Sequence, residues 1–88
     1  MITASEQNLS EVEYKDETFG DLSLCNFQDA RFENCVFTGT VYGCNFTDSV
    51  FSACAVATAV FNACNFMGAT GLNPADITGD VNNFEDVG

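Results

Sequence analysis

The side chains in this chain that could do chemistry are 13 carboxylates, five cysteines, Lys15 and Arg31, and there is no histidine. Catalysis needs a poised acid or base, an activated nucleophile or a metal. The cysteines have no base to activate them, and the carboxylates around Lys15 favour its charged form. The acids do not form an EF-hand loop, and no glycine-rich phosphate loop is present. The sequence therefore predicts a protein that is not an enzyme and binds no metal or cofactor.

The net charge of −11 sets the class of partner. A field of this sign repels nucleic acid and anionic membranes and attracts basic surfaces. The sequence shows neither a signal peptide nor an apolar run long enough to cross a membrane. We therefore expect a cytoplasmic protein that binds no nucleic acid and no membrane directly; for a phage-encoded protein, this means the cytoplasm of the bacterial host.

These residues are positioned by a repeat with a period of five that runs from Cys25 to Phe66. Each unit has Phe, Tyr or Val at its centre, and Cys, Ala, Ser or Thr two places earlier. One unit, Thr40 to Gly43, is a residue short, after which the spacing resumes. A period of five fits neither an α-helix nor an extended strand. One large and one small inward position per unit suit a straight side followed by a corner, and four such sides close a square coil.

This pattern resembles the pentapeptide-repeat family, whose consensus is a small residue, Asp or Asn, Leu or Phe, and two variable polar residues. The resemblance covers about residues 20–79 and implies a right-handed quadrilateral β-helix, an all-β fold with about twenty residues per coil. The known functional members are acidic inhibitors or protectors of DNA gyrase that look like duplex DNA and dimerise end to end. They are roughly twice the length of this chain.

About three coils stacked at the spacing of β-strands, roughly 4.8 Å, sort the large residues into ladders. Phe27, Phe46 and Phe66 form the first ladder, and Phe32 with Phe51 the second. The third side pairs Phe37 with Val56. The fourth is expected to pair Tyr42 with Phe61 and Thr40 with Ala59, with the missing residue at its corner.

All five cysteines occupy the small inward position of the repeat. Stacked cysteines in adjacent coils are expected within the Cα distance that a disulfide requires, so a disulfide framework is the alternative interpretation. Their number is odd, which favours buried, reduced thiols used as small apolar residues. Zinc is disfavoured because there is no CxxC motif and no histidine.

The two ends depart from the repeat and define the domain organisation. Residues 1–18 are predicted to form an acidic N-terminal cap or edge strand, with a disordered tail as the alternative. Residues 19–79 form the β-helix, although Phe19, Leu22 and Leu24 compete for its first interior positions. Residues 80–88 form an acidic tail in which Phe84 either covers the end of the helix, contacts an apolar side or frays.

Two surfaces are candidate partner sites. The acidic surface comprises Asp16, Glu17, Asp21, Asp29, Glu33 and Asp48, and Asp29 and Asp48 occupy equivalent positions in successive coils. The other surface is an apolar side that a terminal segment or a second subunit should cover, because monomers seldom leave such a face bare. Its predicted residues are Val36, Val41, Ala55, Ala57 and Val60.

A rigid coil that holds carboxylates at fixed positions suggests a DNA mimic that occupies a basic channel meant for nucleic acid. The predicted partner is a basic DNA-binding protein or a CRISPR, restriction or topoisomerase complex, and a homodimer is compatible with the sequence. Short, strongly acidic proteins are typical of phage inhibitors of host defence, of the anti-CRISPR or anti-restriction type. The alternatives are a gyrase inhibitor or protector, and a structural solenoid whose acidity only keeps it soluble.

Overall fold

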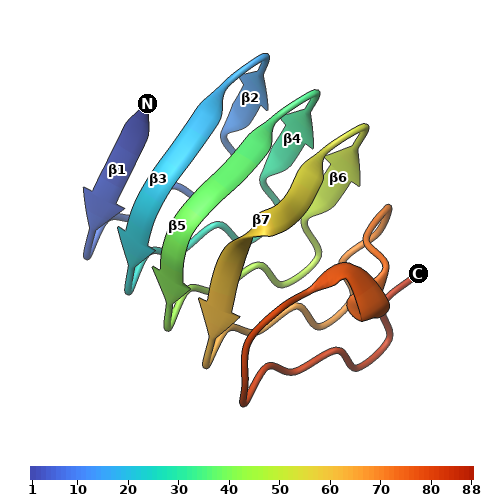
Figure 1. Ribbon diagram of the computed structural model, residues 1–88. Helices are drawn as coiled ribbons and strands as arrows, with labels where there is room; N and C mark the ends of the chain where they lie inside the picture. Colours follow the sequence, from blue (N-terminus) through green and yellow to red (C-terminus); the bar gives the residue numbers. More distant parts are fainter.

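The computed structural model describes residues 1–88, which form two parallel β-sheets wound around one core (Figure 1). The larger sheet has the order β1-β3-β5-β7 and the smaller sheet the order β2-β4-β6. Within each sheet, strands from successive coils pair in parallel. A short 3₁₀ turn, η1, lies near the end of the chain. The bounds are β1 Ile2–Ser5, β2 Glu13–Lys15, β3 Thr18–Ser23, β4 Arg31–Glu33, β5 Val36–Tyr42, β6 Val50–Ser52, β7 Ala55–Asn62 and η1 Pro74–Asp76.

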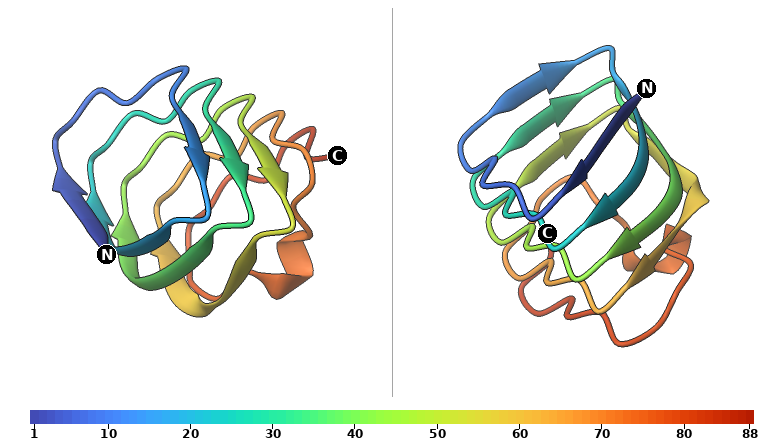
Figure 2. Two further views of the ribbon diagram at one scale, coloured as in Figure 1. Left: turned by 90° about the horizontal axis from the view of Figure 1, so that it is seen from above. Right: turned by 90° about the vertical axis from the view of Figure 1, so that its left-hand side faces the viewer.

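The chain closes into the four-sided β-helix that the repeat predicts, with the right-handed winding that the family resemblance implies. The smaller sheet forms one side, and the larger sheet bends around a corner to form two (Figure 2). The fourth side has no strand and is held by isolated parallel bridges between asparagines one coil apart. No helix in the structure is long and apolar enough to cross a membrane.

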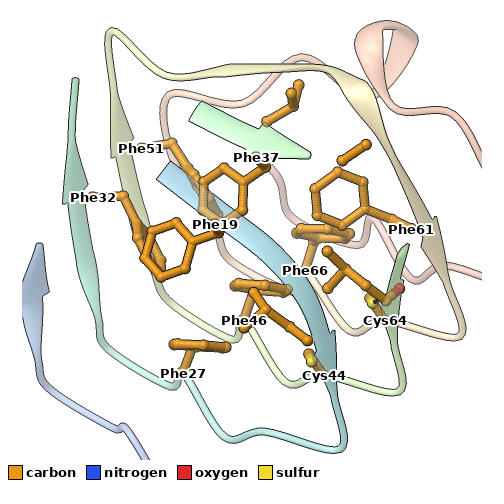
Figure 3. Close-up of a cluster of buried hydrophobic side chains, with 14 of the residues drawn as sticks. Phe19, Phe27, Phe32, Phe37, Cys44, Phe46, Phe51, Phe61, Cys64 and Phe66 are labelled. Carbon is orange, nitrogen blue, oxygen red and sulfur yellow. Dashed lines mark hydrogen bonds between the residues drawn. The ribbon is translucent and has the colours of Figure 1, made fainter. Parts of the chain in front are cut away.

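The predicted phenylalanine ladders are confirmed (Figure 3). The Phe46 ring stacks between those of Phe27 and Phe66, with centroid separations of 5.1 and 5.0 Å and interplanar angles of 5° and 4°. Phe32 stacks on Phe51 at 5.0 Å. Rings on neighbouring sides meet edge to face or tilted, as aromatic quadrupoles favour. The coil spacing and the ring spacing therefore match, and the centre of the helix is filled.

The fourth predicted ladder is wrong by one residue. Val41, expected on the surface, is fully buried and pairs with Phe61, whereas Tyr42, expected inside, is 51% exposed and pairs with Asn62. Thr40 accordingly pairs with Val60, and Ala59 with Gly39.

The physical reason is the position of the missing residue. Register shifts fall between Phe19 and Leu22 and between Val36 and Thr38, before the fourth side begins. The strands β3, β5 and β7 contain 6, 7 and 8 residues, so each successive coil is longer at this corner. The chain thus absorbs the short unit ahead of Val41, which keeps the inward position for Val41 and turns Tyr42 outward.

The strandless side is stabilised by a ladder of asparagines. Each side-chain oxygen accepts the backbone N–H two residues on, at 2.9–3.3 Å. Amide-to-amide bonds of 3.2–3.4 Å link rungs in adjacent coils, for example from Asn26 to Asn8 and from Asn45 to Asn26. The side chains therefore satisfy backbone groups that a strand ladder would otherwise pair. The ladder comprises Asn8, Asn26, Asn45, Asn65 and Asn83.

Both terminal segments add rungs to the same ladders. Residues 1–18 supply β1 and β2, the outermost strands of the two sheets, and the ring of Tyr14 stacks on Phe32. In the C-terminal segment, Phe84 stacks on Phe66 at 5.4 Å and so covers the end of the first ladder. Gly88 exchanges backbone hydrogen bonds with Ala69 and Gly71. At the start of the coil the competition is resolved in favour of Phe19 and Leu22, which are buried, while Leu24 is exposed.

Candidate functional site: an acidic surface

Asp29 and Asp48 lie at the same corner of successive coils. Both are exposed and have left-handed backbones, with φ of 60° and 57°. Their N–H groups donate to the carbonyls of Thr47 and Met67 in the next coil, at 3.0 and 2.9 Å. Aspartate tolerates this conformation better than most residues, because its short polar side chain bonds locally. The corner therefore holds carboxylates on a backbone fixed by the coil ladder.

This corner continues into both terminal segments. Glu11 has φ of 62° and donates its N–H to the carbonyl of Gln28, and Asp86 has φ of 57°. Gly68 occupies the one uncharged rung, and a Cβ there would collide with the Asp48 carboxylate. We call Glu11, Asp29, Asp48 and Asp86 the acidic column.

The other predicted acids lie elsewhere around the coil. Asp16 is at the next corner, where its carboxylate accepts the Asn34 amide at 2.7 Å. Glu17 follows it and is half-buried. The Asp21 carboxylate accepts the N–H of Thr40 at 2.9 Å, and Glu33 is on β4. The six acids predicted from the sequence are thus spread over several sides, and only Asp29 and Asp48 share one column.

The charge is segregated by side. Both cations of the chain, Lys15 and Arg31, lie on the β2-β4-β6 sheet, together with Glu13 and Glu33. This sheet is therefore neutral. The other 11 of the 13 acids lie outside this sheet, where the chain has no Lys or Arg side chain. The whole net charge of −11 belongs to the remaining sides and ends of the helix.

Four of the five residues predicted for the apolar surface are exposed. Val36 and Val60 are each 38% exposed, and Ala55, the register neighbour of Val36, is exposed together with Ala57. They lie on the two sides formed by β5 and β7. Val41 does not belong to this surface, because it is buried. Whether the exposed residues contact a partner stays a prediction.

The thiols are placed as small core residues. All five cysteines are free; Cys54 is half-buried and the others are buried. Cys25 and Cys35 donate to backbone carbonyls at 3.3 and 3.4 Å, and burial raises the pKa of both thiols. The hydrogen bond with Cys64, together with burial, raises the pKa of Cys44. No group of three or more Cys, Asp or Glu is arranged to hold a metal ion.

This burial predicts selective thiol labelling. At pH 7 a bulky disulfide reagent should react within minutes with Cys54 alone, and with all five thiols after unfolding in urea. Because the pKa of Cys25, Cys35 and Cys44 is raised, increasing the pH towards 9 should accelerate labelling of these three thiols only by opening the fold. A colorimetric thiol count under both conditions measures this. Rapid labelling of all five thiols in the folded protein would contradict the packing described.

Comparison with known proteins assigns this chain to no family. No protein-family model matches the sequence, and no curated protein does so. Among solved structures, the chain is similar to a trypsin-treated form of QnrB1, a plasmid-mediated fluoroquinolone resistance protein, with a TM-score of 0.36 and 14% identity. The match covers 98% of this chain and 57% of QnrB1, so the chain spans little more than half of that protein's length. At this level of similarity, the activity of QnrB1 cannot be transferred to this chain.

Sequence reasoning missed two members of the acidic column and the segregation of charge. A signal for Glu11 was present, because Leu9, Tyr14 and Phe19 are spaced by five and extend the repeat towards the N-terminus. Asp86 lies two residues after Phe84, as Asp29 and Asp48 lie two after Phe27 and Phe46. The charge balance of the small sheet depends on strand register, which the local pattern does not give.

Proposed function

We propose that this protein is a non-enzymatic DNA mimic that binds and inhibits a basic nucleic-acid-binding protein or complex of the bacterial cell. The observation that carries the proposal is the presence of eleven carboxylates outside the one sheet that holds Lys15 and Arg31, with no Lys or Arg side chain among them. A basic channel evolved for DNA would attract such a body.

The fixed backbone of the acidic column supports this function. Rungs of a β-ladder are about 4.8 Å apart, and duplex DNA carries one charge per roughly 1.7 Å of axis, counting both strands. One column therefore carries a lower line density of charge than DNA, and the acids on the other sides raise the total. Because backbone hydrogen bonds hold the corners of successive coils together, docking loses little conformational entropy.

The short chain and its high charge favour a phage-encoded inhibitor of host defence, of the anti-CRISPR or anti-restriction type. A target that wraps the helix would use acids on several sides at once, which suits the distribution found around the coil. A gyrase inhibitor or protector is the second candidate within the same class. Its DNA-binding saddle would need a longer rod than this chain supplies alone.

The test is competition with DNA. Immobilised protein should retain basic proteins from a bacterial lysate at low salt, and duplex DNA should elute them. For a contact that replaces six or more phosphates, the affinity should fall by about a thousandfold between 50 and 200 mM salt. Proteins that are retained but not displaced by DNA would argue against mimicry.

Charge reversal locates the contact. The variant Asp29→Lys with Asp48→Lys should lose at least about tenfold in affinity for the captured protein, because two attractive contacts become repulsive. The matched control, Asp76→Lys with Asp80→Lys, changes the net charge equally at the C-terminal end. Equal losses in both variants would mean that only total charge matters, and no loss in either would refute the proposal.

A further inference from the structure

The β2-β4-β6 sheet presents a pattern of charges that is complementary to itself. Glu13 is in register with Arg31, and Lys15 with Glu33. The sign therefore alternates along each strand and also between the two strands. All four side chains are exposed, since Tyr14 and Phe32 take the inward positions between them. We call this outer face of β2, β4 and β6 the paired-charge wall.

The wall is shallow and continues onto an uncharged strand. A depression of about 310 Å³ lies over it, lined by the three residues of β2, the three of β4, and Val50 and Ser52 of β6. Arg31 and Glu33 are in register with Val50 and Ser52, respectively. The wall thus offers four charges with no net charge and a smaller neutral area beside them.

The paired-charge wall is the side of the molecule that holds the Lys and Arg side chains. Outside it the chain carries eleven carboxylates and no Lys or Arg, and only Asp21 of these acids lies on a strand of the larger sheet. At physiological ionic strength charges are screened beyond about 8 Å, so acids on the far sides of two copies would repel weakly. Opposite-charge pairs of side chains between two copies must therefore include the paired-charge wall.

We propose that the paired-charge wall is a docking surface for a second copy of this chain. The copies are related by a two-fold axis parallel to the solenoid axis, which reverses the strand direction of one wall over the other. Glu13 then faces Lys15 of the second copy, and Arg31 faces Glu33 of the second copy. By symmetry four opposite-charge pairs form, and β6 lies over its own counterpart.

The corners of the coil select this arrangement over its alternative. A two-fold axis along the strands would also pair opposite charges, but it would place the acidic column of one copy against that of the other. The axis chosen here places the column against the opposite corner, where Asp16, Asn34 and Ala53 follow one another in successive coils. That corner carries a single acid, so repulsion along the edge is smaller.

The contact is weak because the wall is small. The molecule measures 27 × 23 × 21 Å, so one side buries less than the standard interface of about 800 Å² per partner. Sedimentation equilibrium of the full chain should show a reversible monomer–dimer equilibrium at concentrations up to about 1 mM. A strictly monomeric protein over this range would overturn the proposal.

Charge inversion identifies the surface. We consider the variant Glu13→Lys, Lys15→Glu, Arg31→Glu, Glu33→Arg. It preserves the net charge and the opposite-charge pairs between β2 and β4 within one molecule. It also preserves the opposite-charge pairs between two identical copies. This variant should dimerise like the natural protein. A mixture of the two should contain at least about tenfold fewer mixed dimers than free mixing gives, because all four pairs become repulsive.

Native mass spectrometry with one component ¹⁵N-labelled measures the amounts of the two homodimers and of the mixed dimer. The control variant Asp29→Asn with Asp48→Asn leaves the wall intact and should mix freely with the natural protein. Free mixing of the inverted variant would show that the dimer uses another surface and would overturn the proposal. Circular dichroism verifies that each variant folds. This result is independent of whether the acidic column binds a DNA-binding protein.

Discussion

Replacement of Phe46 by alanine is expected to lower the free energy of unfolding by about 3–5 kcal/mol, the range for a buried phenylalanine. Phe46 is fully buried and stacks between Phe27 and Phe66. Its ring also meets Phe37 and Phe61 edge to face, at centroid distances of 6.4 and 6.3 Å. Truncation therefore removes contacts with rings above, below and beside it and leaves a cavity that the fixed coils cannot close.

Urea denaturation followed by circular dichroism measures the loss. Because a domain of this size is only marginally stable, the variant should be largely unfolded at 37 °C. Val36→Ala is the control, since Val36 is partly exposed on the outer face of β5 and should change stability by less than about 1 kcal/mol. Equal losses for the two variants would contradict a core centred on the stacked rings.

The fold was largely predictable because a period of five places one large residue on every side. The ladder of Phe27, Phe46 and Phe66 and the pair of Phe32 and Phe51 follow from that spacing, and the structure confirms both. The fourth ladder was not predictable, since Val41 and Tyr42 are adjacent, both are apolar, and either could fill the interior. The sequence reveals that one residue is missing between Phe37 and Phe46 but not on which side of Val41. The register of the larger sheet shows that the residue is missing before Val41, because the lengths of successive coils differ at the bend of β3, β5 and β7.

The surface was less predictable than the core. Asp29 and Asp48 fall in one column because they stand two residues after stacked phenylalanines, a local rule. Whether an acid meets a cation depends on which strands become neighbours. Glu13 lies 18 residues before Arg31, and this offset follows from a first coil that is shorter than four full units. The neutral wall thus emerges from the length of one coil.

This segregation of charge gives the two proposals separate surfaces. The acidic column lies on one edge of the paired-charge wall, and the wall itself carries no net charge. A dimer formed through the wall would leave the strandless side and both sides of the larger sheet open. The acids that lie away from the wall would then remain available to a basic partner, in twice the number per particle.

The corrected register makes a prediction with an effect as large as that of the core truncation. Val41→Asp should unfold the protein, because it places a carboxylate on an inward position between Leu22 and Phe61, where no cation is present to pair with it. An uncompensated buried charge costs about 3–5 kcal/mol. The matched control Tyr42→Asp adds the same charge one residue later. It should remain folded because the Tyr42 side chain is half exposed, beside Ser23 and Asn62.

Thermal unfolding of the two variants decides between the registers. With Val41 inside, only Val41→Asp should lose the cooperative transition. If Tyr42 were the inward residue instead, only Tyr42→Asp should lose the cooperative transition. That variant would then bury the charge and also leave the larger cavity. The comparison also has a pH signature: the buried aspartate is neutral only when protonated, so Val41→Asp should regain stability as the pH falls from 7 to about 4. The exposed aspartate of Tyr42→Asp should show no such recovery, since its pKa differs little between the folded and unfolded chain.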